Sequence, residues 1–132
     1  MTNHVHRVAI PERPGGLARA LGQTHGRYAQ HFNRRYRRSG HLWQNRFYSS
    51  PLARDHLVTA LTYVDLNPLR ARLVRRPDEY EWSSARAHTT GVEGDETLDA
   101  WAWSELKIVE DWSGLLQAAL PPLLPIAPLS TI

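Results

Sequence analysis

Apolar side chains recur every three to four positions through much of the first half of the chain, a spacing that predicts helices. The longest such run covers residues 16–38. A second helix is predicted over about residues 52–67, with Ser50 as its N-cap and Pro51 at its first position. Pro68 disfavours an unbroken continuation, so we expect a kink or a restart there.

Two segments have the shorter period that is typical of strands. Residues 4–10 (HVHRVAI) alternate loosely and contain β-branched side chains, which predicts a strand. Residues 41–49 resemble a short hairpin or extended pair. Strands and helices together predict an α+β fold, in which a small antiparallel sheet carries helices on one face.

The last third of the chain differs in character from the rest. Short helices are predicted at residues 83–88 and within 98–120, with a polar loop at 89–96 between them. The last 21 residues carry no charged side chain, but four prolines among them argue against a membrane-spanning helix. We therefore expect a docked or disordered tail and no contact with a membrane.

The charges of the chain are strongly segregated, although its net charge is only +3. Residues 1–76 contain 14 arginines and three acidic residues, whereas residues 77–132 contain two basic and ten acidic residues. Every basic residue except Lys107 is an arginine, whose planar guanidinium pairs with phosphate and stacks on bases. A genome rich in G and C would also favour arginine, but it would not exclude acids from one half. The segregation indicates a polyanion-binding half followed by an acidic appendage.

The absence of cysteine excludes disulfides, thiolate metal sites and a cysteine nucleophile. On a strand, His4 and His6 would project from one face and could bind the same metal ion, although such pairs are more often incidental. On a helix, Tyr63 and Asn67 would lie one turn apart on a shared face. A tyrosine hydroxyl can attack phosphorus, and an amide oxygen suits magnesium or manganese. The alternative makes Tyr63 a half-buried helix residue and Asn67 a C-cap before Pro68.

Aromatic side chains are interleaved with arginines and amides around residues 37–48. Trp43, Phe47 and Tyr48 lie in this segment. The combination suits single-stranded nucleic acid, whose bases stack on aromatic rings while its phosphates pair with arginine. The alternative is that Trp43 and Phe47 are core residues of the predicted hairpin.

Four segments, in this order, match the motifs of one family. They are Asn3–His6 (NHVH), Gly40–Phe47 (GHLWQNRF), Tyr63–Ala71 (YVDLNPLRA) and Tyr80–Ser84 (YEWSS). Together they resemble the single-tyrosine transposases of the HUH superfamily, especially the REP-associated tyrosine transposases and their single-strand insertion-sequence relatives. The resemblance spans about residues 2–90.

The resemblance implies a ferredoxin-like domain that cleaves single-stranded DNA at hairpin-associated sites. Tyr63 would be the catalytic nucleophile that forms a 5′-phosphotyrosine link, and rejoining would reverse this step without a nucleotide cofactor. His4, His6 and Asn67 would be the ligands of magnesium or manganese. It further implies a homodimer in the cytoplasm, associated with the nucleoid. We expect the DNA to contact seven residues: Arg34, Arg35, Arg37, Arg38, Trp43, Arg46 and Arg70.

The position of the histidine motif departs from the family, in which several dozen residues precede it and supply a strand and a helix. We therefore expect residues 1–90 to form a transposase domain that lacks its N-terminal part, and residues 91–132 to form an acidic, then proline-rich extension. One alternative is a catalytically inactive remnant that still binds nucleic acid through its arginines. Another is a remnant without function, held together by its helices.

Overall fold

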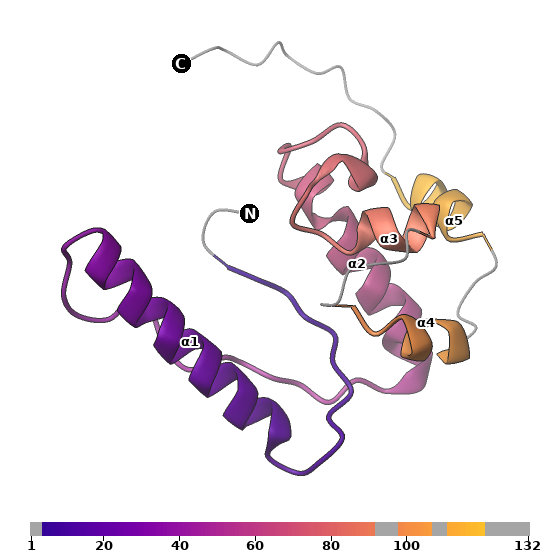
Figure 1. Ribbon diagram of the computed structural model, residues 1–132. Helices are drawn as coiled ribbons and strands as arrows, with labels where there is room; N and C mark the ends of the chain where they lie inside the picture. Colours follow the sequence, from indigo (N-terminus) through magenta and orange to yellow (C-terminus); the bar gives the residue numbers. More distant parts are fainter. Residues whose placement is uncertain (1–3, 92–97, 107–110, 121–132) are drawn as a thin grey trace. The chain divides into compact units, whose positions relative to one another are not determined.

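The computed structural model describes residues 4–91, 98–106 and 111–120 (Figure 1). These residues form helices and no strand. The predicted α+β fold with a small antiparallel sheet, and with it the ferredoxin-like arrangement, is therefore wrong. Residues 4–10 are irregular and residues 41–49 are bent, because neither segment pairs with another within the described ranges. A strand without a hydrogen-bonded neighbour is not stable in water.

The chain divides into two compact units, one formed by Val8–Leu52 and the other by Met1–Arg7 together with Ala53–Ile132. The first contains a single long helix. The second contains the other helices that the structure describes, and its N-terminal segment is far from the rest in sequence. In chain order the elements are α1 (Gly16–Arg35), a 3₁₀ turn (Arg54–His56), α2 (Leu57–Arg70), a 3₁₀ turn (Pro77–Glu79), α3 (Ala85–Thr90), α4 (Ala100–Leu106) and α5 (Trp112–Ala118).

In the Val8–Leu52 unit, the segment after α1 runs back along the helix (Figure 1). The indole Nε1 of Trp43 donates to the backbone oxygen of His25 at 3.0 Å, and the two rings stack with centroids 4.3 Å apart. Near the other end of the helix, Asn33 Nδ2 donates to the backbone oxygen of Gly40 at 2.9 Å. These contacts fix the returning segment without any strand pairing.

The helix predicted at 16–38 is confirmed, but it ends at Arg35. Arg37 adopts the left-handed conformation with φ 50°, and the N–H of Arg38 then reaches the carbonyl of Asn33 at 2.8 Å. This bond back across the last turn is a common way to satisfy the final carbonyls of a helix. The two residues after Tyr36 are therefore exposed arginines outside the helix.

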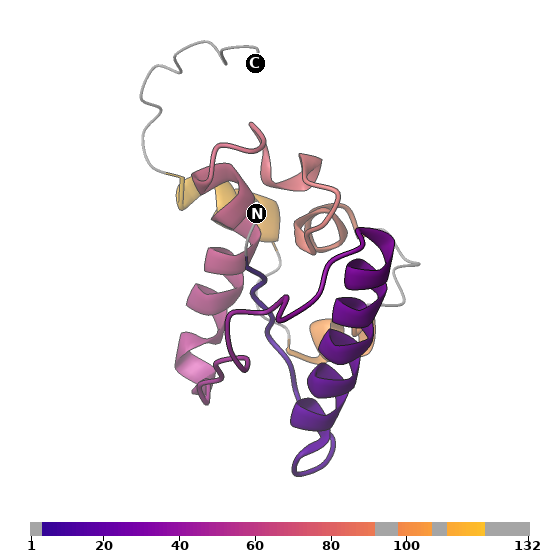
Figure 2. The ribbon, with the colours of Figure 1, turned by 90° about the vertical axis from the view of Figure 1, so that its left-hand side faces the viewer.

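In the other unit, α5 packs against both α2 and α3, and the Pro77–Glu79 turn also contacts both of these helices (Figures 1 and 2). Leu61 and Leu66 of α2 form a buried cluster with Trp112 and Leu116 of α5. Leu61 and Asp65, four residues apart and therefore on one face of α2, are both buried, so this face of the helix is directed into the protein. The core of the unit therefore depends on a helix near the C-terminal end of the described chain.

The second helix differs from the prediction at both ends. It begins at Leu57, after the Arg54–His56 turn, so Ser50 is not its N-cap. It also continues through Pro68 to Arg70 without a restart. Proline removes one N–H of the ladder, and so close to the C-terminus this loss affects only the last turn.

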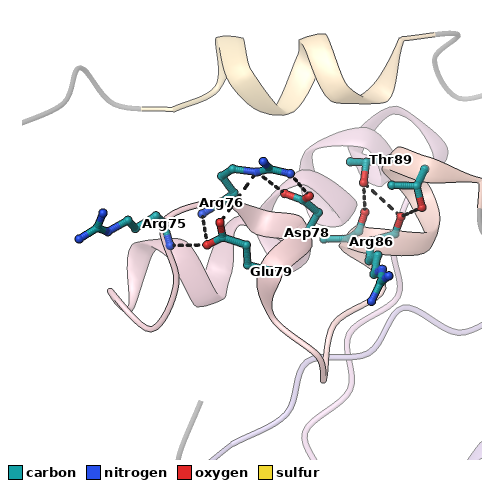
Figure 3. Close-up of polar contacts among 8 residues, drawn as sticks. Arg75, Arg76, Asp78, Glu79, Arg86 and Thr89 are labelled. Carbon is teal, nitrogen blue, oxygen red and sulfur yellow. Dashed lines mark hydrogen bonds and ion pairs between the residues drawn. The ribbon is translucent and has the colours of Figure 1, made fainter.

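The turn between α2 and α3 is stabilised by local polar contacts (Figure 3). Glu79 Oε2 accepts hydrogen bonds from the backbone N–H groups of Arg75 and Arg76, each at 3.1 Å. The guanidinium of Arg76 also pairs with Asp78, and the hydrogen bond holds the pKa of that carboxyl below its ordinary value. These contacts orient the chain as it leaves α2.

The short helices predicted in the C-terminal third are present. The one expected at 83–88 lies at Ala85–Thr90, and the span 98–120 contains both α4 and α5. The loop expected at 89–96 is wrong for Thr89 and Thr90, which belong to α3. The rest of that loop from residue 92 on, and the expected tail beyond residue 120, lie outside the described residues. Among the helices that the structure describes, none is long and apolar enough to cross a membrane.

Candidate functional site

Tyr63 projects from the exposed side of α2, away from the core. Leu61 and Leu66 direct one face of the helix into the protein, whereas the Tyr63 side chain is 46% exposed. A helix fixes the backbone of this residue, and exposure leaves its hydroxyl accessible to a large substrate. The position is therefore suitable for a nucleophile that attacks a polymer.

The histidine pair lies beside this tyrosine although no strand forms. The ring centroid of His6 is 5.3 Å from that of Tyr63, in an edge-to-face arrangement with an interplanar angle of 81°. The ring of His4 is 4.9 Å from that of His6, again edge to face. The structure thus brings together three side chains that the sequence proposed for one site, and all three belong to one unit.

Arg70 adds a positive charge to the same place. Its guanidinium carbon is 5.6 Å from the centre of the Tyr63 ring, seven residues and about two turns along α2. Arg70 forms no ion pair with an acidic side chain of the described residues, and it is exposed. It is therefore available to pair with an anion next to the tyrosine.

Asn67 is half-buried, one helical turn from Tyr63. Its Nδ2 is buried and has no hydrogen-bond partner within the described part of the chain. A buried amide without a partner is uncommon, and its oxygen and nitrogen could exchange places by a half-turn of the side chain. Asn67 therefore has an unused polar group on the turn that follows the tyrosine.

The structure brings two imidazoles to Tyr63, whereas Asn67 is placed only by its helix, one turn after the tyrosine. Imidazole nitrogens and an amide oxygen are donors of kinds that divalent cations accept. No group of three or more His, Cys, Asp or Glu side chains that could hold a metal occurs in the described ranges. Any cation here would therefore need the amide of Asn67 beside His4 and His6.

The ionisation of His6 favours metal binding. Partial burial, and then the charge of His4, lower the pKa of His6 from its ordinary value of 6.5. The neutral imidazole, which is the form that binds metals, therefore persists to lower pH than in a histidine with the ordinary pKa.

We expect an NMR titration to show His6 losing its proton below pH 6.5, and His4→Gln to move that pKa back part of the way. Since the folded pKa is lowered, the contribution of His6 to stability is fully present above pH 6.5 and is lost as the pH falls through the folded value. A His6 that titrates at or above 6.5 would contradict this environment.

The other candidate DNA contacts lie in the Val8–Leu52 unit and are exposed, except for one. Trp43 is half-buried, and both its ring and its indole N–H are used by His25. Trp43 therefore packs on α1, and the hairpin to whose core the alternative interpretation assigned it does not form. The exposed arginines at the end of α1 and in the segment after it are Arg34, Arg35, Arg37, Arg38 and Arg46.

A buried carboxylate under the site was missed at the level of sequence. Asp65 is fully buried and accepts three hydrogen bonds: from Ser84 Oγ at 2.8 Å, from His88 Nδ1 at 2.8 Å and from Trp112 Nε1 at 3.0 Å. The donors come from the start of α3, from α3 and from α5. Asp65 therefore fixes α2, the helix of Tyr63, against both neighbours.

The same network extends to α4 through stacked rings. Trp103 stacks on His88 with centroids 3.7 Å apart and an interplanar angle of 7°, and it meets Trp112 edge to face. The sequence contained one signal of this arrangement, because Asp65 lies four residues after Leu61 on the apolar face of the helix. Its partners lie up to 47 residues away, so no local pattern could name them.

Comparison of the chain with protein families, with characterised proteins and with solved structures finds no match. The resemblance to tyrosine transposases therefore rests on the four sequence segments alone and stays a prediction.

Proposed function

We propose that this protein cleaves and rejoins single-stranded DNA through a covalent link to Tyr63. The observation that supports the proposal is the cluster of Tyr63, His6 and His4, with Arg70 over the tyrosine ring. It assembles a half-exposed tyrosine, two imidazoles and an arginine that pairs with no acidic side chain of the described ranges, from segments more than 50 residues apart. Such a combination suits attack on a phosphodiester.

In the proposed reaction the Tyr63 hydroxyl oxygen attacks phosphorus as it loses its proton. The bond from phosphorus to the 3′ oxygen breaks, and that oxygen takes up a proton to leave as a free 3′-hydroxyl. The 5′ phosphate stays on the tyrosine. Attack by a 3′-hydroxyl reverses each of these changes, so rejoining requires no nucleotide cofactor.

The surrounding residues have separate roles in this proposal. Arg70 pairs with a non-bridging phosphate oxygen and holds the phosphate next to the tyrosine. His4, His6 and Asn67 would hold magnesium or manganese, which when bound supplies positive charge that polarises the phosphate. Asp65 positions the helix but does not touch the substrate.

The exposed arginines of the Val8–Leu52 unit would bind phosphates of the DNA backbone. Such contacts release counterions, and for single strands the logarithm of the affinity falls with the logarithm of the salt concentration by about 0.7 per neutralised phosphate. Association with the nucleoid and assembly as a homodimer remain parts of the proposal.

Replacing Arg34 and Arg35 together by glutamine is expected to reduce the salt slope by about 1.4, if each arginine neutralises one phosphate. Fluorescence anisotropy of a labelled hairpin oligonucleotide, measured over a range of salt concentrations, provides the slope. Arg75→Gln is the control, since this exposed arginine lies outside that unit. Equal slopes for the double variant and the wild-type protein would show that Arg34 and Arg35 do not contact DNA phosphates.

The proposed function is tested by incubating the purified protein with hairpin-containing single-stranded DNA and manganese or magnesium. The DNA carries a label at its 3′ end, because the proposed link retains the fragment with the 5′ phosphate. We expect a labelled species of protein mass on a denaturing gel, and expect EDTA to prevent its formation. If no such species forms with either metal over a panel of hairpin sequences, covalent cleavage is excluded for those substrates.

A second candidate function is binding of nucleic acid without cleavage. It is favoured by the exposed arginines at the end of α1, which pair with no acidic side chain among the described residues. Salt-sensitive binding of the same hairpin without a covalent species would support it.

A further inference from the structure

A hollow of about 380 Å³ lies next to Tyr63, between α2 and α5. Its apolar lining includes Val58 of α2, Leu115 of α5 and Ala119 directly after α5. Tyr63 and Arg70 of α2 also line it. The side of the hollow that α5 forms therefore comes from a part of the chain for which the sequence predicted no role.

The placement of α5 is fixed by contacts other than the hollow itself. Trp112, at the start of α5, is buried and hydrogen-bonded to Asp65, and Leu116 belongs to the core. The next turn carries Leu115 and Ala119 to the rim beside Tyr63. The hollow is thus built on the same network that fixes the tyrosine helix.

The polar groups of the hollow point to a ligand with an anionic end. No acidic side chain lines it, and Arg70 contributes a cation that no described acidic residue pairs with. The Thr62 hydroxyl is buried at the wall and has no hydrogen-bond partner among the described residues. An apolar cavity with a few polar groups is the usual form of a small-molecule site.

We propose that this hollow binds the base of the nucleotide next to the cleaved phosphate. This inference rests on the proposed function and names a subsite of the same site. The flat base lies against Val58, Leu115 and Ala119, while its phosphate pairs with Arg70 beside Tyr63. A nucleotide accounts for both features, because a purely anionic ligand would not need the apolar lining and a purely apolar one would not need the arginine.

The test compares tetrathymidylate with a tetramer of the same charge that carries abasic sites in place of the bases. Binding is followed through the methyl NMR signal of Leu115, which responds to a ligand in the hollow itself. The buffer contains no metal, so the DNA is not cleaved during the measurement. We expect the tetrathymidylate to bind at least about tenfold more tightly than the abasic tetramer, since the latter has no base to bury against the apolar lining. Equal affinities at Leu115 would overturn the inference.

Two variants and a matched control sharpen this result. Ala119→Phe fills the hollow and is expected to weaken the tetrathymidylate about tenfold, which is about 1.4 kcal/mol, while binding of the abasic tetramer is unchanged. Thr59→Phe obstructs the hollow from α2 and provides a second variant if the first does not fold. Ala118→Phe adds the same ring at an exposed neighbouring position and leaves both affinities unchanged. Wild-type affinity in both hollow variants would contradict the assignment.

The outcome is separable from that of the proposed function. Base-dependent binding at Leu115 without a covalent species in any metal would support the subsite and reject cleavage. Covalent cleavage without a base-dependent signal at Leu115 would support the proposed function and reject the subsite. The cleavage assay with Ala119→Phe adds a further check, because loss of the base contact is expected to slow formation of the covalent species.

Discussion

Replacing Tyr63 by phenylalanine is expected to abolish the covalent DNA species, by at least about 1,000-fold, because the variant lacks the only atom that would bond to phosphorus. The ring itself remains, so its contacts with His6 and Arg70 are retained. We therefore expect hairpin binding to change by less than about twofold. The 3′-labelled gel assay gives the first quantity, and fluorescence anisotropy gives the second.

Tyr48→Phe is the matched control for this variant. Tyr48 is 92% exposed and lies in the other unit, so removal of its hydroxyl is expected to leave the covalent species unchanged. A labelled species that persists in Tyr63→Phe would show that another residue is the nucleophile. A species lost equally in both variants would point to a general effect on the protein.

Replacing Asp65 by alanine is expected to reduce the free energy of unfolding by about 3–5 kcal/mol, as for other buried charges whose partners are left unpaired. Ser84, His88 and Trp112 would each lose their acceptor inside the protein. Asp65→Asn keeps the shape and one acceptor oxygen, so a smaller loss is expected. Urea unfolding followed by tryptophan fluorescence measures both changes.

Asp55→Ala serves as the control for this series. The Asp55 carboxylate is 76% exposed and forms an ion pair with the exposed His56, so its loss is expected to cost less than about 1 kcal/mol. Trp112→Phe removes a single donor and remains informative if Asp65→Ala does not fold. If the urea midpoint of Asp65→Ala equals that of the wild-type protein, the hydrogen bonds of Asp65 do not hold these helices together.

The two variants are expected to act on different properties of the same helix. Tyr63 lies on the exposed face of α2 and Asp65, two residues later, lies on the buried face. Tyr63→Phe should therefore leave the urea midpoint close to that of the wild-type protein. Asp65→Asn should reduce cleavage only as far as it loosens the helix, so hairpin binding by the arginines of the other unit should remain.

The positions of the helices could be predicted from sequence, whereas the strands could not. Residues 16–38 and 52–67 have an apolar period that is set within each segment, and helical hydrogen bonds also form within the segment. A strand at 4–10 needs a partner from elsewhere in the chain. No such partner occurs in the described ranges, so the local alternation around Val5 and Val8 was not sufficient.

For the candidate site, the sequence by itself determined which chemical groups are present and how far apart Tyr63 and Asn67 lie along their helix. Tyr63 and Asn67 lie one turn apart because both belong to one helix, and the arginine-rich half follows from composition. Only the tertiary structure placed His4 and His6 beside Tyr63, buried Asp65 among its three donors, and brought Leu115 and Ala119 to the same hollow as Val58. The partners of Asp65 lie 19 to 47 positions away, and the other contacts join the first residues of the chain, or α5, to α2. Burial of the apolar faces of α2 and α5 brings such distant segments together, and no period within one segment records it.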